Sequence, residues 1–455
     1  MSTERLRVFT FNCWGLKYVS QNRTERIAAL ARALAETDYD IIALQELWVF
    51  SDYEHVRASV SKRLPHAKFF YSGALGSGLV IFSRFPIVAA TVHPYSLNGS
   101  PIDVIAGDWF VGKAAASVLI AHPTLGQVQV FNTHLFAKGG DEGPDHHKAH
   151  RLVNAWEFAK LARQAAELGR YVIAAGDFNS VPTAPPMGII RDHASLIDAW
   201  TQSHGHVRNP SLSNIPTPAD AIHIHGVTAD SPLNSYSAGK TLEPYARCFQ
   251  GKRLDYIFHR HPTVSAGDEI PSLRCVDSKV TMTDPVPRYS FSFSDHFGLE
   301  ATFEISPAES VIGTANDTCA VQSSEADFAL ASVSNPQPKP GRNLSPDLIT
   351  STLQSLTARY RYAHSQARFH LMVFAISLFL LLCLIIGSAW LPHSWISPIF
   401  MVAAVFLAWL ATTMLYVGFV YGKWETNALT NIIEELEIYK ESLEEHGSDR
   451  RRGRS

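Results

Sequence analysis

The sequence lacks the marks of a disulfide scaffold and of a structural zinc site. Its five cysteines are odd in number and none forms a CxxC pair, so we expect reduced thiols. It also lacks an excess of charge of either sign, since 39 basic and 42 acidic side chains leave a net charge of −3. This balance argues against a nucleic-acid partner held by long-range attraction. No apolar segment lies near Met1, which argues against a cleaved signal peptide.

Two uncharged apolar runs dominate the C-terminal third of the chain. They occupy residues 371–391 and 399–421, and each is long enough to cross a bilayer. Two buried helices of a soluble protein are the alternative, which the adjacency of the runs disfavours. Basic residues flank the pair on its outer sides, whereas the short loop between the runs has only a histidine. The positive-inside rule therefore places both flanks in the cytosol.

These runs divide the chain into six expected segments. They are an N-terminal domain at 1–305, a flexible linker at 306–344, a juxtamembrane helix at 345–370, transmembrane helices at 371–391 and 399–421, and a cytosolic C-terminal helix with a basic tail at 422–455. The linker is rich in Ser, Ala, Asn and Pro. An apolar stripe from Leu429 to Leu443 predicts a helix that lies on the membrane or pairs with a copy of itself; a solvated helix is the alternative.

Residues 1–305 alternate strand-like and helix-like segments. Periodicity predicts helices over 23–35, 52–64 and 146–168, and a strand pair over 113–121 and 128–134. Strands outnumber long helices and several are consecutive, which favours an α/β fold with a two-sheet sandwich over a doubly wound sheet. Residues 201–250, rich in Ser, Pro, Asn and His, are expected to form a surface loop or insertion.

Polar residues end six predicted strands. In one of them the apolar run that begins at Tyr171 leads through Gly176 to Asp177 and Asn179. An Asx turn that merely closes a strand is the alternative for this stretch. Asn12, Glu46, His134, Asp255 and the pair Asp295–His296 follow other apolar runs in the same way. Because ligands bind at strand ends in layered α/β folds, we expect these side chains to converge.

The residue types suit hydrolysis of a phosphate ester, which needs a metal, a base for water and donors to the phosphate. Glu46 is the expected metal ligand, because a hard oxygen with few companions suits Mg²⁺. His296 is the expected general base, and Asp255 is a candidate to fix its tautomer. Asn12, Asn179 and His134 are expected to donate to phosphate oxygens, and Asp177 to orient water or a neighbouring donor.

Seven motifs in chain order carry a resemblance to a known family. They are Phe11–Gly15, Gln45–Trp48, Gly76–Leu79, Thr133–Leu135, Gly176–Asn179, Arg253–Tyr256 and Ser294–His296. The set resembles the endonuclease/exonuclease/phosphatase superfamily, which has the four-layered α/β sandwich of pancreatic deoxyribonuclease. Within it, the chain is similar to membrane-anchored neutral sphingomyelinases and fungal inositol phosphosphingolipid phospholipases C. The motifs cover residues 6–300, and the two-helix tail matches that subfamily as well.

The resemblance implies a Mg²⁺-dependent phospholipase C, with Mn²⁺ as a substitute metal, that cleaves phosphosphingolipids to ceramide and a phosphorylated head group. It implies Glu46 as the Mg²⁺ ligand, His296 as the base, Asp255 as its partner, Asn12, His134, Asp177 and Asn179 around the phosphate, and Asp295 in support of the metal or of His296. Inositol phosphate and choline phosphate head groups both stay open. The alternatives are a membrane-tethered nuclease or inositol-phosphate phosphatase of the same fold, and a non-catalytic membrane adaptor.

The stretch Gly107–Lys113 partly fits a nucleotide-binding P-loop. The residue after the lysine should be Ser or Thr to reach Mg²⁺, and it is Ala114, so a simple turn is the alternative. The stretch is similar to a P-loop-like segment of the sphingolipid hydrolases, which implies a role in activity for Asp108 and Lys113. We expect their pairing to rearrange when an anionic phospholipid such as phosphatidylserine binds as activator.

The remaining expectations concern partners and location. The substrate is a phosphosphingolipid in the bilayer, nucleic acid is not expected as a partner, and a homo-oligomer is left open. We expect a two-pass integral membrane protein whose N-terminal domain and C-terminus are cytosolic. The endoplasmic reticulum is the expected membrane, with a mitochondrial membrane as the alternative.

Overall fold

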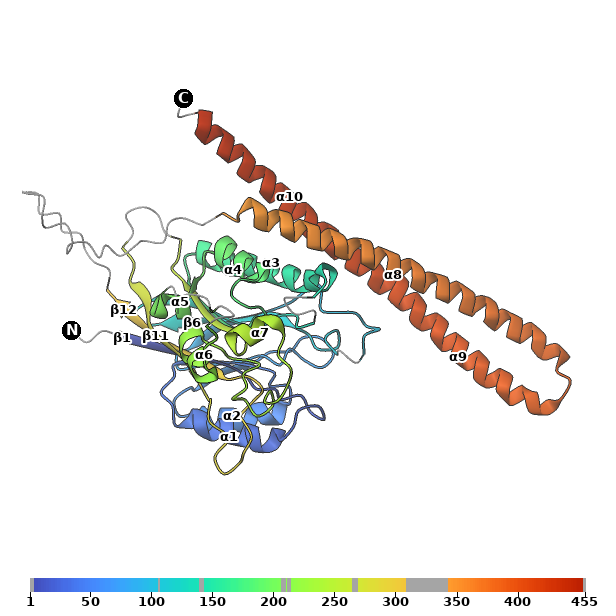
Figure 1. The fold of residues 1–455 in the computed structure, drawn as a ribbon, viewed down its shortest axis with the longest axis horizontal. Helices are drawn as coiled ribbons and strands as arrows, with labels where there is room; N and C mark the ends of the chain where they lie inside the picture. Colours follow the sequence, from blue (N-terminus) through green and yellow to red (C-terminus); the bar gives the residue numbers. More distant parts are fainter. Residues whose placement is uncertain are drawn as a thin grey trace, which may run out of the picture.

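The computed structural model describes residues 4–104, 107–138, 143–205, 210, 214–263, 269–307 and 343–452. Two six-stranded sheets lie face to face between helices (Figure 1). The first sheet has the order β11 (Ser272–Thr281), β12 (Gly298–Ser306), β1 (Glu4–Asn12), β2 (Ile41–Gln45), β4 (Val80–Ser83) and β3 (His66–Phe69). The second has the order β5 (Ile87–Pro94), β6 (Ala114–His122), β7 (Gly126–His134), β8 (Tyr171–Asp177), β10 (Asp255–Arg260) and β9 (Ile197–Asp198).

Three apolar cores hold these layers together. Side chains of both sheets, such as Val8 and Val130, fill the central core. Helices α1 (Arg23–Ala35) and α2 (Phe50–Val60) cover the first sheet, and α3 (Asp145–Glu167) and α4 (Pro185–Ala194) cover the second. Strands buried on both faces are apolar along most of their length, as β2 and β8 are before their last residues, Gln45 and Asp177. The predicted two-sheet sandwich is therefore confirmed.

Two local predictions need correction. The predicted helix at 52–64 begins earlier and ends at Val60, because Val49 is extended and Phe50 already belongs to the helix. The predicted surface loop at 201–250 contains short helices: the end of α5 (Ala199–His204), α6 (Pro218–His225) and α7 (Pro244–Phe249). Thr217 caps α6 by accepting a hydrogen bond from the backbone amide of Asp220 at 3.1 Å. The composition of this segment did not reveal that Thr217 starts a helix.

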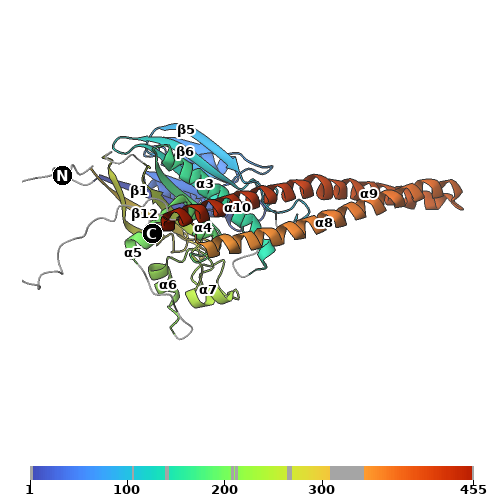
Figure 2. The same ribbon diagram turned by 90° about the horizontal axis from the view of Figure 1, so that it is seen from above.

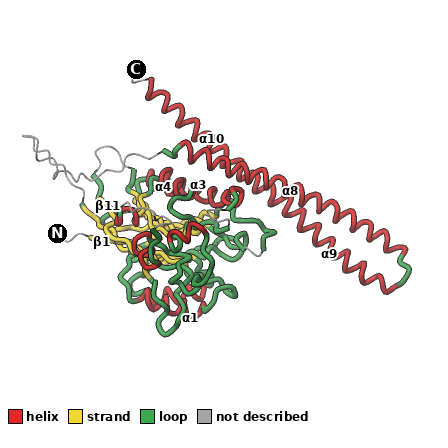
Figure 3. The backbone as a smooth tube through the Cα atoms, in the orientation of Figure 1, coloured by secondary structure: helices red, strands yellow, loops and turns green. Residues whose placement is uncertain are grey.

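The C-terminal helices form a long pair that projects from the sandwich (Figure 3). Helix α8 (Pro346–Gly387) runs without a break through the predicted juxtamembrane helix and most of the first predicted span. Two short 3₁₀ turns, η1 (Ser388–Trp390) and η2 (Ser394–Ile396), connect it to α9 (Ser397–Leu415), which continues through the π-helical η3 (Tyr416–Tyr421) into α10 (Gly422–Arg452). Both long helices are apolar and long enough to cross a membrane by length and composition.

The inner half of this helix pair packs on the sandwich. Helices α8 and α10 lie along α3 and α4 (Figure 2). Leu429 and Leu436 of the α10 stripe are fully buried there, and Tyr439 packs against the same core. The prediction that this stripe lies on the membrane or pairs with a second copy was wrong, because α3 and α8 cover it. Residues 308–342 of the predicted linker and 453–455 of the tail lie outside the described residues.

Candidate active site

One end of the sandwich gathers the predicted site residues, although three of them are not at strand ends. Asn12 is paired with Gln45 at the C-terminal ends of parallel β1 and β2, and His134 with Asp177 at those of parallel β7 and β8. Asp255 lies opposite Asp177 but begins β10. The prediction that Asp255 ends a strand was wrong, as it was for Asp295–His296, which precede β12. Because β10 and β12 are antiparallel to their neighbours, their starts reach the same edge.

An acidic cluster forms one side of the site. The Asn12 side-chain amide donates to Glu46 Oε1 at 3.2 Å and to Asp177 Oδ2 at 3.0 Å. Burial, followed by the charge of Asp295, raises the pKa of Glu46, while Lys113 and Asn12 oppose the shift. Glu46 also has a left-handed backbone with φ of 56°, a conformation that costs energy and is common at functional sites. A divalent cation fits this donor set, because it would relieve the repulsion between Glu46 and Asp295.

His296 stands on the other side with two carboxylates. Its Nδ1 lies 2.8 Å from Asp255 Oδ2, and its Nε2 lies 3.9 Å from Asp177 Oδ2. Burial disfavours the charged imidazole, but the charges of Asp255 and Asp177 outweigh it and raise the pKa of His296 well above its ordinary value. Asp255 is itself fully buried. A histidine whose Nδ1 is held by a carboxylate can present Nε2 to a proton donor, as a general base must.

His134 contacts the lysine of the predicted switch. Lys113 Nζ lies 3.1 Å from His134 Nε2 and donates to the Leu135 carbonyl at 2.9 Å. An ammonium group only donates, so Nε2 accepts and the His134 proton is assigned to Nδ1. Burial and the nearby Lys113 lower the pKa of His134 well below its usual range, which keeps the ring neutral. Asp108 Oδ1 lies 3.3 Å from Lys113 Nζ, so the pair that the sequence singled out is formed.

The turn after β8 sets the position of Asn179. Gly176 has φ of 146°, and a side chain there would meet the Thr133 carbonyl at 2.1 Å, so only glycine fits between β7 and β8. The Asp177 carboxylate accepts the backbone amide of Asn179 at 2.9 Å, and the Asn179 side-chain amide donates to the Leu135 carbonyl at 2.9 Å. The Asx turn, which was the alternative for this stretch, is therefore formed, and it places Asn179 at the cleft pocket together with His296.

Several polar residues that shape the site escaped the sequence analysis. Asn132 accepts a hydrogen bond from Gln45 at 2.7 Å and donates to the Leu44 carbonyl at 2.8 Å, which links the two sheets beneath the site. The fully buried Arg26 donates to the backbone carbonyls of Cys13, Trp14 and Phe293. The position of Gln45 directly before Glu46 was the one sequence feature that could have pointed to this link. Arg26 lies inside an ordinary helical pattern, and nothing in the sequence marked it as part of the site.

A pocket of about 230 Å³ opens beside His296, and we call it the cleft pocket. Asn179, Asp295 and His296 line it on the side of the predicted catalytic residues. Ser237 and Lys240 line it from the segment at 201–250 that was predicted to be a surface loop, and Lys252 lines it from just after that segment. That segment therefore belongs to the site.

The tightest group of metal-ligand types in the described part of the chain does not include Glu46. Asp177, Asp255 and His296 offer ligand atoms that all lie within 4.8 Å of one another. The same trio contains the paired base, so a cation bound there would compete with a proton for His296. Glu46 with Asp295 thus remains the donor set that leaves His296 available.

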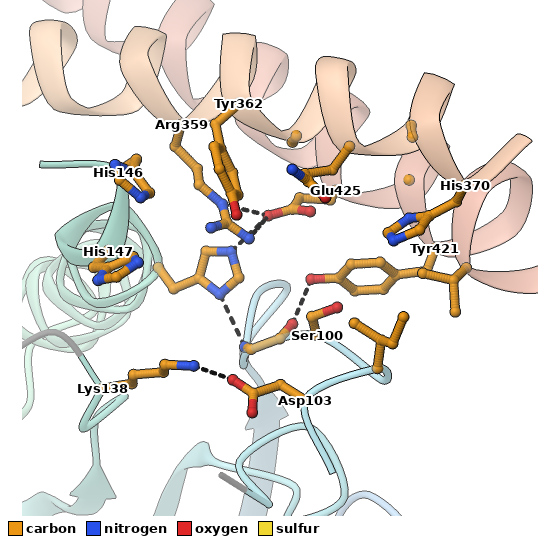
Figure 4. Close-up of a pocket in the computed structure, with 18 of the residues that line it drawn as sticks. Ser100, Asp103, Lys138, His146, His147, Arg359, Tyr362, His370, Tyr421 and Glu425 are labelled. Atoms are coloured by element: carbon orange, nitrogen blue, oxygen red, sulfur yellow. Dashed lines mark hydrogen bonds and ion pairs between the residues drawn. The ribbon is translucent and has the colours of Figure 1, made fainter. Parts of the chain in front are cut away.

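A second pocket of about 390 Å³ lies where the helix pair meets the sandwich, and we call it the junction pocket. It is drawn in Figure 4, where Glu425 and Arg359 point toward each other and Tyr421 points to the loop near Ser100. Arg359 Nε donates to Glu425 Oε1 at 2.6 Å, and His150 Nε2 lies 2.8 Å from the same oxygen. The Tyr421 hydroxyl donates to the Gly99 carbonyl. The helices therefore bind the loop that leads to Asp108 and Lys113.

Comparison with known proteins adds an independent finding. Residues 9–296 match the Endonuclease/Exonuclease/phosphatase family. The chain is 34% identical over 452 residues to the inositol phosphosphingolipids phospholipase C of Schizosaccharomyces pombe, covering 97% of this chain and 96% of that protein. The Saccharomyces cerevisiae protein of the same name is 27% identical over 455 residues, covering 95% and 89%. Sphingomyelin phosphodiesterase 2 of Rattus norvegicus is 31% identical over 298 residues, covering 66% and 64%.

Proposed function

The chain belongs to the endonuclease/exonuclease/phosphatase family, and from that premise we propose that it is a phosphodiesterase that cleaves phosphosphingolipids as a phospholipase C does. Water attacks phosphorus, the bond from phosphorus to the ceramide oxygen breaks, and a phosphorylated head group is released. The names of relatives that match nearly the whole chain, helix pair included, support this substrate class. The helix pair would keep the enzyme beside a substrate that stays in the bilayer.

The observation that carries the proposal is the pair of His296 with the buried Asp255 at the wall of the cleft pocket. Asp255 holds Nδ1, so Nε2 can take a proton from the attacking water. Asn179, whose side-chain amide has a second N–H besides the one given to the Leu135 carbonyl, can donate to the phosphoryl oxygens as negative charge builds on them. Asn12 already donates to Glu46 and Asp177, and His134 Nε2 accepts from Lys113, so donation from these two requires that substrate exchange those contacts. Asp177 accepts from Asn12 and Asn179 and so orients both.

We infer that the metal is Mg²⁺, with Mn²⁺ as a substitute, and that Glu46 with Asp295 beside it would hold the ion. When bound, the ion would neutralise charge that develops on the phosphoryl oxygens. Glu46→Gln should raise the Mg²⁺ concentration that gives half-maximal turnover by at least tenfold. Asp177→Asn is the matched test of the alternative metal site formed by Asp177, Asp255 and His296. If this variant raises the half-maximal Mg²⁺ concentration more than Glu46→Gln does, the metal site is that trio.

The test of the function uses full-length protein purified in detergent and mixed with vesicles. The vesicles contain an inositol phosphosphingolipid or sphingomyelin, with and without Mg²⁺, and release of the phosphorylated head group is measured. The proposal predicts Mg²⁺-dependent release that His296→Ala abolishes. Nicking of plasmid DNA or release of phosphate from inositol phosphates, in place of lipid cleavage, would favour the nuclease or phosphatase alternative. Equal inactivity of wild type and His296→Ala would favour the non-catalytic adaptor.

We further propose that anionic phospholipid, with phosphatidylserine as the probe, activates the enzyme at the cytosolic leaflet of the endoplasmic reticulum membrane. Arg359, paired with Glu425, and Lys138, paired with Asp103, line the junction pocket where the helix pair would leave the bilayer, and an anionic head group would compete with these carboxylates for them. The Asn98 side chain donates to the Lys113 carbonyl at 3.0 Å, so this loop connects the pocket to the Asp108–Lys113 pair. Phosphatidylserine should stimulate wild type but not Asp108→Asn or Lys113→Ala, and full stimulation of both variants would refute the switch.

A further inference from the structure

The wall of the cleft pocket that faces His296 comes from residues 229–254, and up to the Arg253–Tyr256 motif the sequence analysis assigned this region no catalytic or binding role. Ala229, Asp230, Ser237, Lys240, Lys252 and Leu254 line the pocket from this side. The pocket volume of about 230 Å³ is below the roughly 300–1,000 Å³ typical of drug-sized ligands. It therefore suits a single small head group rather than a whole lipid.

This wall is fixed to the catalytic side by hydrogen bonds in both directions. The backbone amide of Ser235 donates to Ser292 Oγ at 3.0 Å, and the amide of Ser292 donates to Ser235 Oγ at 2.8 Å. Asn234 is fully buried and donates to the Ser294 carbonyl at 2.9 Å. Ala229 forms isolated bridges with both Lys252 and His296. The wall thus holds its distance from the base, as a recognition surface must.

The two lysines of the wall differ in how their charge is balanced. Lys252 Nζ lies 2.7 Å from Glu243 and 3.3 Å from Asp230, so two carboxylates neutralise it. Lys240 is exposed at the pocket and has no ion-pair partner among the described residues. Lys240 therefore contributes an unbalanced positive charge to the pocket.

The composition of the pocket favours one kind of head group. A quaternary ammonium is recognised by aromatic faces, and no aromatic side chain lines the cleft pocket in the part of the chain that the structure describes. A polyol needs closely spaced donors and acceptors, which Asp230, Ser237 and Lys252 provide. The unbalanced charge of Lys240 would repel a choline group and attract a polyol phosphate.

We propose, on the basis of the proposed function, that Lys240 is a specificity-determining residue that selects a polyol phosphate head group over choline phosphate. Its ammonium group donates to the oxygens of the polyol phosphate at the mouth of the pocket. Asp230, Ser237 and Lys252 complete the polar wall behind it. The segment that contains α7 thereby has a function, which is to read the head group.

The experiment compares Lys240→Met with wild type on two lipids of identical ceramide, an inositol phosphosphingolipid and sphingomyelin. Loss of one charged hydrogen bond should lower kcat/KM for the inositol lipid about tenfold more than for sphingomyelin, mainly through KM. Lys240→Arg should restore the preference. Lys62→Met, the same change at an exposed lysine outside the pocket, should leave the ratio unchanged. An equal fall for both lipids in Lys240→Met would overturn the proposal.

Binding of products separates this inference from the function on which it rests. myo-Inositol 1-phosphate and choline phosphate are titrated into detergent-purified wild type and Lys240→Met in Mg²⁺ buffer. Preferential binding of the inositol compound that is lost in Lys240→Met supports the pocket even if neither lipid is cleaved. Equal binding of both compounds by wild type overturns the inference even if both lipids are cleaved.

Discussion

Two histidines in this protein, the fully buried His150 and the largely covered His296, contact a carboxylate at the same distance, and their pKa values shift in opposite directions. His296 Nδ1 lies 2.8 Å from Asp255 in the active site, and His150 Nε2 lies 2.8 Å from Glu425 at the junction. Burial disfavours the charged form of both rings. In His296 the neighbouring acids prevail and the pKa rises well above its ordinary value, whereas in His150 the pKa is lowered.

The surroundings of each pair explain the difference. Asp177 adds a second acid next to His296. At the junction, Arg359 shares the Glu425 carboxylate, so part of the negative charge is already neutralised. The second nitrogen of His150 accepts the backbone amide of Gly99 at 2.9 Å, which holds the ring in one neutral tautomer. The distance in an ion pair therefore does not reveal its role: the first pair is suited to proton transfer, and the second fastens the helices to the sandwich.

The strongest test of this comparison removes each histidine in turn. His296→Ala should reduce kcat/KM about 10³-fold, because the proton of the attacking water then has no acceptor. His150→Gln should leave the turnover per folded molecule within about threefold of wild type, because its proton takes no part in the chemistry. Head-group release and thermal unfolding are measured on the same preparations. An equal loss of turnover in both variants, with both still folded, would break the comparison.

Removal of the shared carboxylate at the junction should mainly affect stability. Glu425→Ala leaves Arg359 and His150 buried without their partner, and loss of one member of a buried pair costs about 3 kcal/mol. Chemical unfolding in detergent should show this loss, and hydrogen exchange should rise over α10. Glu434→Ala, at an exposed position of the same helix, is the matched control. If Glu425→Ala and Glu434→Ala lower the unfolding free energy by similar amounts, the junction pair does not fasten the helix.

Asp255→Asn tests the cause of the raised pKa of His296. The variant should lower kcat/KM about 10²-fold, because Nδ1 loses the carboxylate that favours its proton. A base acts only when deprotonated, so wild-type turnover is lost as the pH falls through the raised pKa. Without Asp255 that pKa falls, and the acid limb of the kcat/KM profile should move to lower pH. Asp277→Asn, at an exposed strand position, should leave the limb in place, and an unmoved limb in Asp255→Asn would contradict the assignment.

The convergence of the site residues could be predicted because each follows or precedes an apolar run, and such runs must stack in the core. Periodicity carries no strand direction, however. Asp255 and His296 were therefore assigned to strand ends, although they stand at strand starts. Asn132, which pairs with Gln45, was missed because a buried amide in a strand has no local mark. Its partner is distant in the sequence and close only in the fold.

The same limit applies outside the site. The apolar stripe that includes Leu429 and Leu436 predicts a helix with one covered face, and an amphipathic pattern does not name what covers it. The cover is α3 together with α8, and their own patterns do not identify the partner of either helix. Lys240 stands in a stretch whose Ser and Pro content suggested a surface loop. Its role depends on hydrogen bonds such as that between Ser235 and Ser292, which are long-range contacts.

A third histidine, which is buried and has no carboxylate partner in the part of the chain that the structure describes, sharpens the comparison further. His193 packs against Trp156 of α3 and Tyr439 of α10, with ring centroids 4.4 Å and 5.2 Å away. Burial, followed by the charges of Arg163 and Lys160, lowers the pKa of His193 to about 4. In the unfolded chain His193 has a pKa near 6.5. Between pH 4 and pH 6.5 the unfolded chain therefore binds more protons at this residue than the folded chain does. The contribution of His193 to stability is therefore complete above pH 6.5 and is lost as the pH falls toward 4.

The difference between the His193 pKa of the folded chain and that of the unfolded chain corresponds to about 2 kcal/mol of stability lost between pH 8 and pH 5. His193→Phe keeps the aromatic packing and removes the titration. Between pH 8 and pH 5 the unfolding free energy of this variant should therefore fall by about 2 kcal/mol less than that of wild type. Chemical unfolding in detergent at the two pH values measures it. His55→Phe, at an exposed position of α2, is the matched control and should keep the wild-type slope. If His193→Phe also keeps that slope, burial without a carboxylate does not make a histidine acid-sensitive here, and the contrast between His296 and His150 loses its physical basis.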